Sequence, residues 1–421
     1  MNEEFLQYIW QFQKFDHTSL QVDGSEIQVM HPGYRNTDAG PDFFNARIKI
    51  KETIWAGNVE IHVNASDWEK HNHSNDKAYE NVILHVVWKN DKNIKGYNDN
   101  TLPCLCLEEH VSKSALAQYR NFMQSKQWIA CENLLQQVDS FKKEAWLQRL
   151  LIERLEEKSQ RVLDIFKYEN NNWINTIYRF LALNMGFKLN NQAFELLANV
   201  LPFEYLAKHA DNLFQLEAMI FGQAGMLNNS FTDIYPQKLK KEYEFLQQKF
   251  SLKPIDSSIW RFMRIHPNNF PTIRLAQFAA IIHNAQHIMP LIFDYTNAEN
   301  IKLLFNAEAS AYWHTHYLFD KPTNSRSKKL GESAISLLII NFIAPLYAAY
   351  SKAKGDYTYM EKAVDLLNNT KGEKNNIITR WGALDFNTSN AAHTQALLQL
   401  KNTYCNHKKC LQCSIGNMLL K

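Results

Sequence analysis

Glycine and proline are scarce in this chain, with 13 and 11 examples among 421 residues. This scarcity excludes a collagen-like or low-complexity organisation and predicts few long loops or linkers. No segment recurs at a fixed period, which argues against a solenoid. The formal net charge is only +3, whereas dedicated nucleic-acid binders are usually more basic, so any basic surface must be local.

Signals for targeting and for a membrane are also missing. The N-terminus, MNEEFLQYIW, has neither a basic region nor an apolar core, so we expect no signal peptide and a cytoplasmic location. The longest apolar run, residues 334–350, contains Asn341 and Pro345 and is shorter than the ~20 residues of a membrane span, so we expect a buried core helix and no membrane contact. The six cysteines should then be thiols or metal ligands and not disulfides.

Aromatic residues, by contrast, are plentiful, with 25 Phe, 18 Tyr and 10 Trp, so large buried cores can form. Residues 3–14 have the spacing of an amphipathic helix, and Asp23-Gly24 is a hairpin signal. Strand-like patterns follow at 43–51, 54–63, 81–88 and around Leu105. We therefore predict an α+β domain with a mixed sheet over residues 1–110. From residue 111 to 421 the apolar period is helical, most clearly at 142–166, which predicts a large all-α domain.

Two acids and a histidine stand out in the predicted sheet. Strand alternation places Glu60 and His62 on one face, and Asp42 begins the preceding strand. A hairpin closed around Glu52-Thr53 would bring Asp42 opposite about residue 63, near Glu60. Two close carboxylates favour a hard divalent cation, Mg²⁺ or Mn²⁺, which can activate water against a phosphodiester. His62 could then act as a base near neutral pH.

The same residues have a purely structural interpretation. Asp42 would cap a turn after Pro41, and Glu60 would form a surface ion pair. We favour a site, because inward-pointing acids on a hairpin need a partner.

Pro41-Asp42 followed by Glu60-x-His62 on the next strand resembles the PD-(D/E)xK phosphodiesterase fold, which is the restriction-endonuclease-like fold. The resemblance implies that Asp42 and Glu60 hold the metal, that His62 stands where the fold expects Lys, and that the helix at 3–14 is the leading helix, with Glu4 as an additional acid. The departure at His62 leaves catalysis open, because Lys is a cation at pH 7 and His mostly is not.

The whole chain also resembles a bacterial family of unknown function. The segments that carry this resemblance are GPDFFNARI (40–48), GNVEIH (57–62), SDW…H…H…D…Y…NVILHVV (66–87), EAMIFGQAG (217–225), RIHPNNFPTIRLAQ (264–277), YWHTHYLFD (312–320) and YCNHKKCLQCSIG (404–416). This family implies no activity, so function must come from the residues.

Further histidines lie close by in the sequence. A transition-metal hydrolase site could be assembled from His62, His71, His73, Asp76 and His85, although the spacing matches no zinc motif. Alternatively, His85 is a core histidine, and His71 or His73 contacts a scissile phosphate.

Two sets of residues in the helical region are also candidates. Cys405, Cys410 and Cys413, with Cys131 or His407 as a fourth ligand, could hold Zn²⁺ or an Fe–S cluster, or they could simply be buried thiols. Arg261, Arg264 and Arg274 surround Pro271, where a helix should begin, and could contact phosphate or cross-link helices.

The leading hypothesis is therefore a metal-dependent nuclease, or a protein derived from one, acting on DNA or RNA. The alternatives are a non-catalytic nucleic-acid or ribonucleoprotein binding module and a structural partner in a larger assembly.

Overall fold

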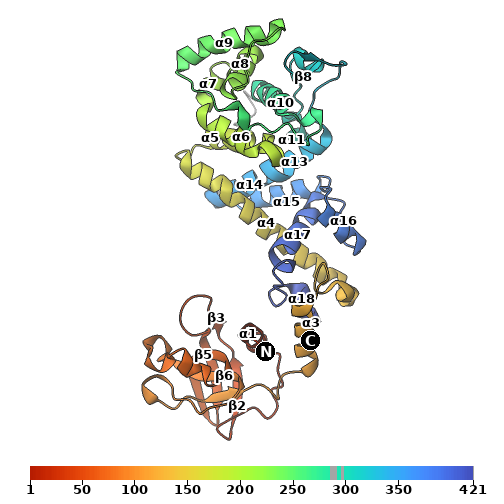
Figure 1. The fold of residues 1–421 in the computed structure, drawn as a ribbon. Helices are drawn as coiled ribbons and strands as arrows, with labels where there is room; N and C mark the ends of the chain where they lie inside the picture. The colour runs from red at the N-terminus through yellow and green to blue at the C-terminus, as the bar shows by residue number, and fades with distance from the viewer. Residues whose placement is uncertain (285–291, 295–297, 421) are drawn as a thin grey trace. The chain divides into compact units, whose positions relative to one another are not determined.

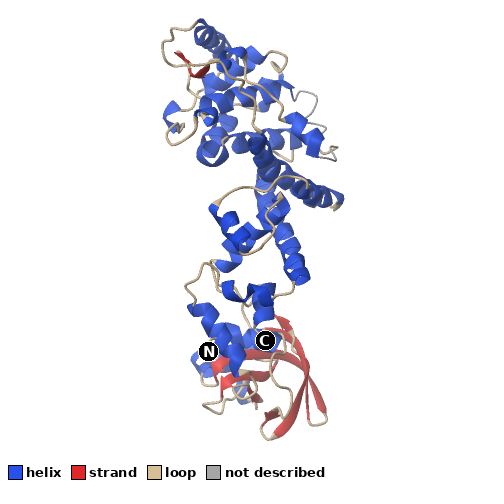
Figure 2. Ribbon diagram, turned by 90° about the vertical axis from the view of Figure 1, so that its right-hand side faces the viewer, coloured by secondary structure: helices blue, strands red, loops and turns tan. Residues whose placement is uncertain are grey.

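The computed structural model describes residues 1–284, 292–294 and 298–420. The chain divides into two compact units. The first consists of Met1–Trp146 and the C-terminal segment that starts at Lys401, and the second is Leu147–Leu400. The predicted order, an N-terminal mixed sheet followed by helices, is confirmed (Figure 1; Figure 2).

The first unit is built on a seven-stranded sheet. Its strands are β1 (Gln21–Val22), β2 (Ser25–His31), β3 (Tyr34–Arg35), β4 (Phe43–Ile50), β5 (Thr53–Asn64), β6 (Val82–Lys89) and β7 (Cys104–Cys106). They lie in the order β1-β2-β4-β5-β6-β7, and β3 pairs with β4. The strands from β1 to β5 pair antiparallel, whereas β5, β6 and β7 are parallel neighbours. The predicted hairpin at Asp23-Gly24 is confirmed, and its Gly24 has φ +71°.

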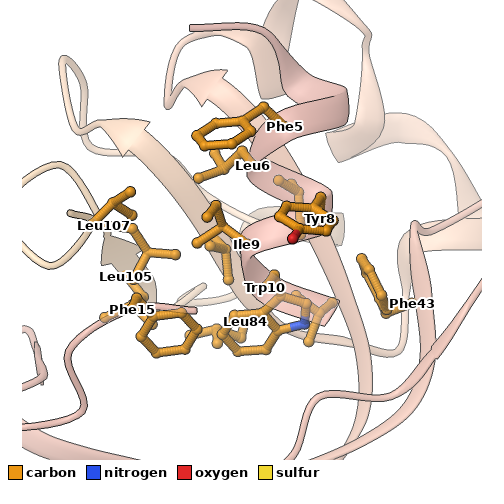
Figure 3. Packing of buried hydrophobic residues seen from close by; sticks show 14 of the residues in the cluster. Phe5, Leu6, Tyr8, Ile9, Trp10, Phe15, Phe43, Leu84, Leu105 and Leu107 are labelled. Carbon is orange, nitrogen blue, oxygen red and sulfur yellow. The ribbon is translucent and has the colours of Figure 1, made fainter. Parts of the chain in front are cut away.

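Helix α1 (Glu3–Gln11) covers the apolar face of this sheet. Asn2 caps it by accepting a hydrogen bond from the Phe5 N–H at 3.2 Å. Its buried side chains, among them Phe5, Ile9 and Trp10, meet Leu84 of β6 and Leu105 of β7 (Figure 3). Burial of such large side chains is the main source of stability for this unit.

The first unit extends beyond residue 110, the boundary expected from the sequence. Helix α3 (Lys113–Gln124) adds Leu116, Tyr119 and Phe122 to the core of the sheet, and the C-terminal segment adds Leu411 and Leu420. The 3-10 helix η4 (Glu132–Gln137), the π-helical turn η10 (Leu400–Cys405) and helix α18 (Ser414–Leu419) complete this part. The reason for the difference is that helical periodicity shows that a segment is helical and not which core it packs against.

The second unit is helical. Helix α4 (Ser140–Tyr168) leads into it, followed by α5 (Trp173–Met185), α6 (Phe187–Val200), α7 (Phe203–Ala207), α8 (Leu213–Gln223), α9 (Ile234–Phe250), α10 (Pro271–Asn284), α11 (Ala298–Leu304), α12 (Ala311–His314), α13 (Glu332–Leu338), α14 (Ala344–Lys354), α15 (Thr358–Asn368), α16 (Asn376–Ala383) and α17 (Ala391–Gln399). One departure from the predicted all-α domain is the short antiparallel pair β8 (His316–Leu318) and β9 (Lys321–Pro322).

The apolar run near residue 340 forms one continuous helical stretch, Glu332–Lys354, with a π-helical turn at Ile339–Ile343. By length and composition alone this stretch could cross a membrane, but 67% of its most apolar window is buried inside the protein. This burial agrees with the expected core helix.

Candidate functional site

The β4–β5 hairpin brings Asp42 beside Glu60. The Asp42 N–H donates to Glu60 Oε2 at 3.0 Å, and the Ile61 N–H donates to Asp42 Oδ2 at 3.1 Å. Asp42 therefore lies next to residues 60 and 61 and not opposite residue 63. An irregularity between Phe43 and Ala46, where Asn45 has φ +56°, shifts the pairing of the strands.

Helix α1 holds the Asp42 carboxylate from its other side. Gln7 Nε2 donates to Asp42 Oδ1 at 2.8 Å, and Arg35 Nη2 donates to Gln7 Oε1 at 3.0 Å. Both Asp42 oxygens thus accept hydrogen bonds from the protein. Neither Gln7 nor Arg35 was expected from the sequence, because no motif marks them. Glu3 of α1 interacts electrostatically with this site. Burial raises its pKa, and the nearby His71 and His73 act to lower it.

Glu4, the acid expected from the resemblance, instead lies near Tyr119. Neighbouring residues of a helix point about 100° apart, so Glu3 and Glu4 cannot serve the same site.

The crossover from β5 to β6 supplies two histidines. It contains helix α2 (Asp67–Lys70) and the 3-10 helices η1 (His73–Asn75) and η2 (Lys77–Tyr79). Asn72, between the two histidines, adopts the left-handed conformation with φ 60°. This turn lets both His71 and His73 face His62 of β5, with ring centroids 4.9 and 5.3 Å away.

Four ligand atoms converge at this point. His62 Nε2 lies 3.1 Å from His71 Nδ1 and 3.5 Å from Glu60 Oε1. Glu60 Oε1 also lies 3.4 Å from His73 Nε2. One nitrogen from each of the three histidines falls within 4.8 Å of the others. Ligands about 2.0–2.2 Å from a tetrahedral ion lie about 3.3–3.6 Å apart, so the three histidines could hold a metal ion, with Glu60 Oε1 beside two of them.

The aromatic surroundings fix the histidine rings. Tyr79 stacks on His73 with ring centroids 3.8 Å apart, and the Trp68 ring lies 5.2 Å from those of His73 and His85. His85 Nε2 lies 2.9 Å from His62 Nδ1, which leaves His62 Nε2 directed at the cluster. A ligating histidine typically has such a partner on its other nitrogen.

Burial shifts the pKa values of the histidines and acids at this site. Desolvation, followed by the nearby histidines, lowers the pKa of His62 to about 3, and desolvation lowers that of His85 to about 4. These rings are neutral at pH 7, with lone pairs available for a metal. The pKa values of Asp42 and Glu60 are raised, first by burial; for Asp42 the neighbouring Glu60 charge adds to this. A divalent cation would relieve the desolvated carboxylates.

Two nitrogens of this cluster, His73 Nε2 and His85 Nδ1, are among the buried side-chain atoms that have no hydrogen-bond partner within the described ranges. His73 Nε2 has only the Glu60 carboxylate at 3.4 Å, a distance to which no hydrogen bond is assigned. Buried polar atoms almost always have a partner, so an ion between these atoms fits the donor set. Asp76, considered in the sequence for the same cluster, instead caps η2 by accepting from the Ala78 N–H at 2.9 Å.

The four cysteines considered as metal ligands, Cys131, Cys405, Cys410 and Cys413, are neighbours within the first unit. Lys401 Nζ and Lys408 Nζ donate to the carbonyls of Trp128 and Met123, which ties the C-terminal segment to the segment that carries Cys131. Burial raises the thiol pKa values of Cys131, Cys405, Cys410 and Cys413, and each of the first three is raised further by its cysteine neighbours. The remaining cysteines, Cys104 and Cys106, lie on β7.

The three arginines are not brought together. Arg261 and Arg264 are exposed, whereas Arg274 is buried in α10 and donates to Gln277 and Asn269. All three belong to the second unit. The hydrogen bonds of Arg274 to Asn269 and Gln277 agree with the structural interpretation, in which these arginines connect parts of the helical region.

Neither a curated protein nor a solved structure matches this chain. A family model does match, over residues 3–376, which is most of the chain. Its range includes the sheet, the histidine cluster and almost all of the second unit. The chain therefore belongs to the family described as protein of unknown function (DUF2851).

Proposed function

We propose that this protein is a metal-dependent hydrolase of nucleic-acid phosphodiesters, or a descendant of one. The observation that carries the proposal is the convergence of Glu60 Oε1 with His62 Nε2 and His73 Nε2 at 3.5 and 3.4 Å. His71 Nδ1 completes the set from the exposed side of the cluster.

The donor set favours a transition metal over Mg²⁺. Mg²⁺ prefers oxygen ligands and keeps several waters, whereas imidazole nitrogen suits Zn²⁺ and Fe²⁺ and is also accepted by Mn²⁺. We therefore assign His62, His71, His73 and Glu60 as ligands. Asp42 becomes a positioning residue, because its N–H holds Glu60 Oε2 and its own oxygens are engaged by Gln7 and Ile61.

The phosphodiester class is supported by the arrangement of the elements. Helix α1 leads, Asp42 directly precedes β4, and Glu60-x-His62 lies on β5 of the same antiparallel hairpin. This is the order expected from the resemblance to the PD-(D/E)xK fold. A bound metal would activate water and offset charge on the phosphoryl oxygens. Glu60 and the histidines would hold the ion, and the buried Trp68 and Tyr79 form an apolar wall on the inner side of the cluster.

The test is a cleavage assay on single- and double-stranded DNA and RNA. The full-length protein is stripped of metal and then supplied with Zn²⁺ or Mn²⁺. We expect cleavage only with metal, and a loss of at least about 100-fold in Glu60→Gln, because a ligand is removed. The control is Glu52→Gln in the exposed β4–β5 turn, where the Glu52 side chain is 96% exposed. Cleavage that survives both metal removal and Glu60→Gln would contradict the proposal.

A non-catalytic nucleic-acid binding module is the second candidate. The observation in its favour concerns His62, which is buried and has a lowered pKa. A neutral imidazole therefore occupies the position where the resembled fold has a cationic Lys. In that case nucleic acid would bind without being cleaved, and its affinity would fall steeply with salt.

We further infer that Cys131, Cys405, Cys410 and Cys413 bind a second metal with a structural role. Burial raises the pKa of Cys413, while hydrogen bonds from the N–H groups of Ile415 and Gly416 to its Sγ act in the opposite direction and favour the thiolate. Gly416 permits this close approach, since a Cβ there would lie 2.2 Å from the Cys410 carbonyl oxygen. Neighbouring cysteines can ligate Zn²⁺ or an Fe–S cluster, and they lose their protons when the metal binds.

Elemental analysis of anaerobically purified protein tests this inference. We expect either one zinc or about four irons with a yellow-brown colour per chain, in addition to any ion at the histidines. Cys410→Ser should lose this metal, whereas Cys104→Ser on β7 should retain it. Six freely titrating thiols in the native, metal-free protein would contradict it.

A further inference from the structure

A basic pocket lies in the second unit, far in sequence from the histidine cluster. It has a volume of about 370 Å³ and forms between the start of α10 with the residues before it and the segment 326–334. Its lining includes Arg274, Arg326, Lys328, Lys329 and His266, and it contains no aspartate or glutamate. The pocket is therefore electropositive without an acid of its own.

Lys328 is the decisive residue, because it is a lysine with only 2% of its surface exposed. Its Nζ has no hydrogen-bond partner and no ion pair in the part of the chain that the structure describes. The nearest compensation is the ring of Tyr317, whose centroid is 3.8 Å from Nζ. An ammonium group left this way is costly, since buried charges are normally paired.

The fold holds Lys328 in this position. Gln277 of α10 donates from Nε2 to the Lys328 carbonyl oxygen at 3.0 Å. Through its other atom, Oε1, Gln277 accepts from Arg274 Nη1 at 2.9 Å. One buried amide thus ties the backbone of Lys328 to the Arg274 guanidinium.

Arg274 likewise forms no ion pair with an acidic side chain among the described residues. It is 8% exposed, lies 4.4 Å from the Phe187 ring centroid and donates to the amide oxygens of Asn269 and Gln277. Its Nε has no partner within the described residues, and burial lowers its pKa to about 10. A guanidinium that is buried among neutral acceptors retains its full charge for a ligand.

The neighbouring acid does not neutralise the pocket. Glu308 lies 3.7 Å from Lys329 and 3.1 Å from His314, and it accepts from Ser327 Oγ at 2.6 Å. It is thereby engaged with residues other than Lys328 and Arg274. An anion entering the pocket would supply the negative charge that Glu308 does not offer to these two side chains.

We propose that this pocket binds the phosphate group of a small phosphate monoester. A dianion with several acceptor oxygens matches two fixed buried cations together with the cations at the rim. The volume exceeds that of phosphate alone and lies in the range of small-molecule sites, which leaves room for an attached group. A pocket of about 370 Å³ has the size for a compact monoester and not for the continuous backbone of a duplex.

Calorimetry with the full-length protein tests the proposal, with inorganic phosphate, AMP and adenosine as probes. We expect phosphate and AMP to bind and adenosine not to bind. Lys328→Met keeps the length and apolar character of the side chain and should weaken phosphate and AMP at least 10-fold. The matched control is Lys321→Met, an exposed lysine on β9 that does not line the pocket. Its affinity should equal that of the unmodified protein.

Stability without ligand gives a second readout. Removing an unpaired buried ammonium should leave the melting temperature of Lys328→Met unchanged or raised, so lost binding cannot be attributed to unfolding. Glu60→Gln should bind phosphate normally, which separates this proposal from the proposed hydrolase. Equal binding of phosphate by Lys328→Met and the unmodified protein would overturn the proposal, as would AMP binding no more tightly than adenosine.

Discussion

Glu60→Gln is expected to lower the affinity for Zn²⁺ or Mn²⁺ at the histidine cluster by at least about 100-fold, because changes even in outer partners of a metal site cost 10–100-fold. Glu60 Oε1 lies 3.5 Å from His62 Nε2 and 3.4 Å from His73 Nε2. Glutamine has nearly the same shape, so the change removes a charge and a ligand without opening a cavity. Isothermal titration of the metal-free protein measures the effect, with circular dichroism as the check on folding.

Two further variants sharpen this result. Asp42→Asn should weaken the metal less, by about 10–100-fold, because it changes the carboxylate that accepts from Gln7 Nε2 and the Ile61 N–H, while the Asp42 backbone N–H that holds Glu60 Oε2 is kept. Glu52→Gln, in the exposed turn of the same hairpin, should leave the affinity unchanged. Full affinity in Glu60→Gln would show that the four ligand atoms do not share an ion. An Asp42→Asn loss larger than that of Glu60→Gln would instead restore the pair of acids as the metal ligands.

Trp10→Ala is expected to lower the stability of the first unit by about 3–5 kcal/mol, the usual cost of removing a large aromatic side chain from a core. Trp10 is fully buried beneath the sheet, its Nε1–H donates to the Pro32 carbonyl oxygen at 2.9 Å, and its ring stacks with that of Phe15 (Figure 3). The change therefore leaves a cavity and removes the hydrogen bond to the partly buried Pro32 carbonyl oxygen.

Hydrogen–deuterium exchange of the full-length protein can localise this effect. Peptides of β4, β5 and β6 should exchange faster in Trp10→Ala, because they share the core that α1 completes. Trp55→Ala on β5 is the control, since Trp55 is 48% exposed and should cost no more than about 0.5 kcal/mol. Similar exchange in the two variants would mean that α1 does not contribute to the stability of the sheet.

Much of the fold could be predicted because local patterns carry it. Asp23-Gly24 specifies a tight turn, alternation specifies β4 and β5, and the apolar run 81–88 specifies a strand buried on both faces. These signals depend on neighbours in the sequence, where turn chemistry and side-chain periodicity act directly. The grouping of Asp42, Glu60 and His62 followed from the same local reasoning, and the hairpin does place Asp42 next to Glu60.

The sequence by itself thus determined the order of sheet and helices and the chemical character of the hairpin. The tertiary structure decided the rest: the shift at Asn45, the crossover that turns His71 and His73 toward His62, and the return of the C-terminal cysteines to the first unit. It also decided that Lys328, which no motif marks, is buried beside Arg274. The physical reason is that burial and charge compensation depend on contacts between segments distant in sequence, whereas periodicity reports only on the segment itself.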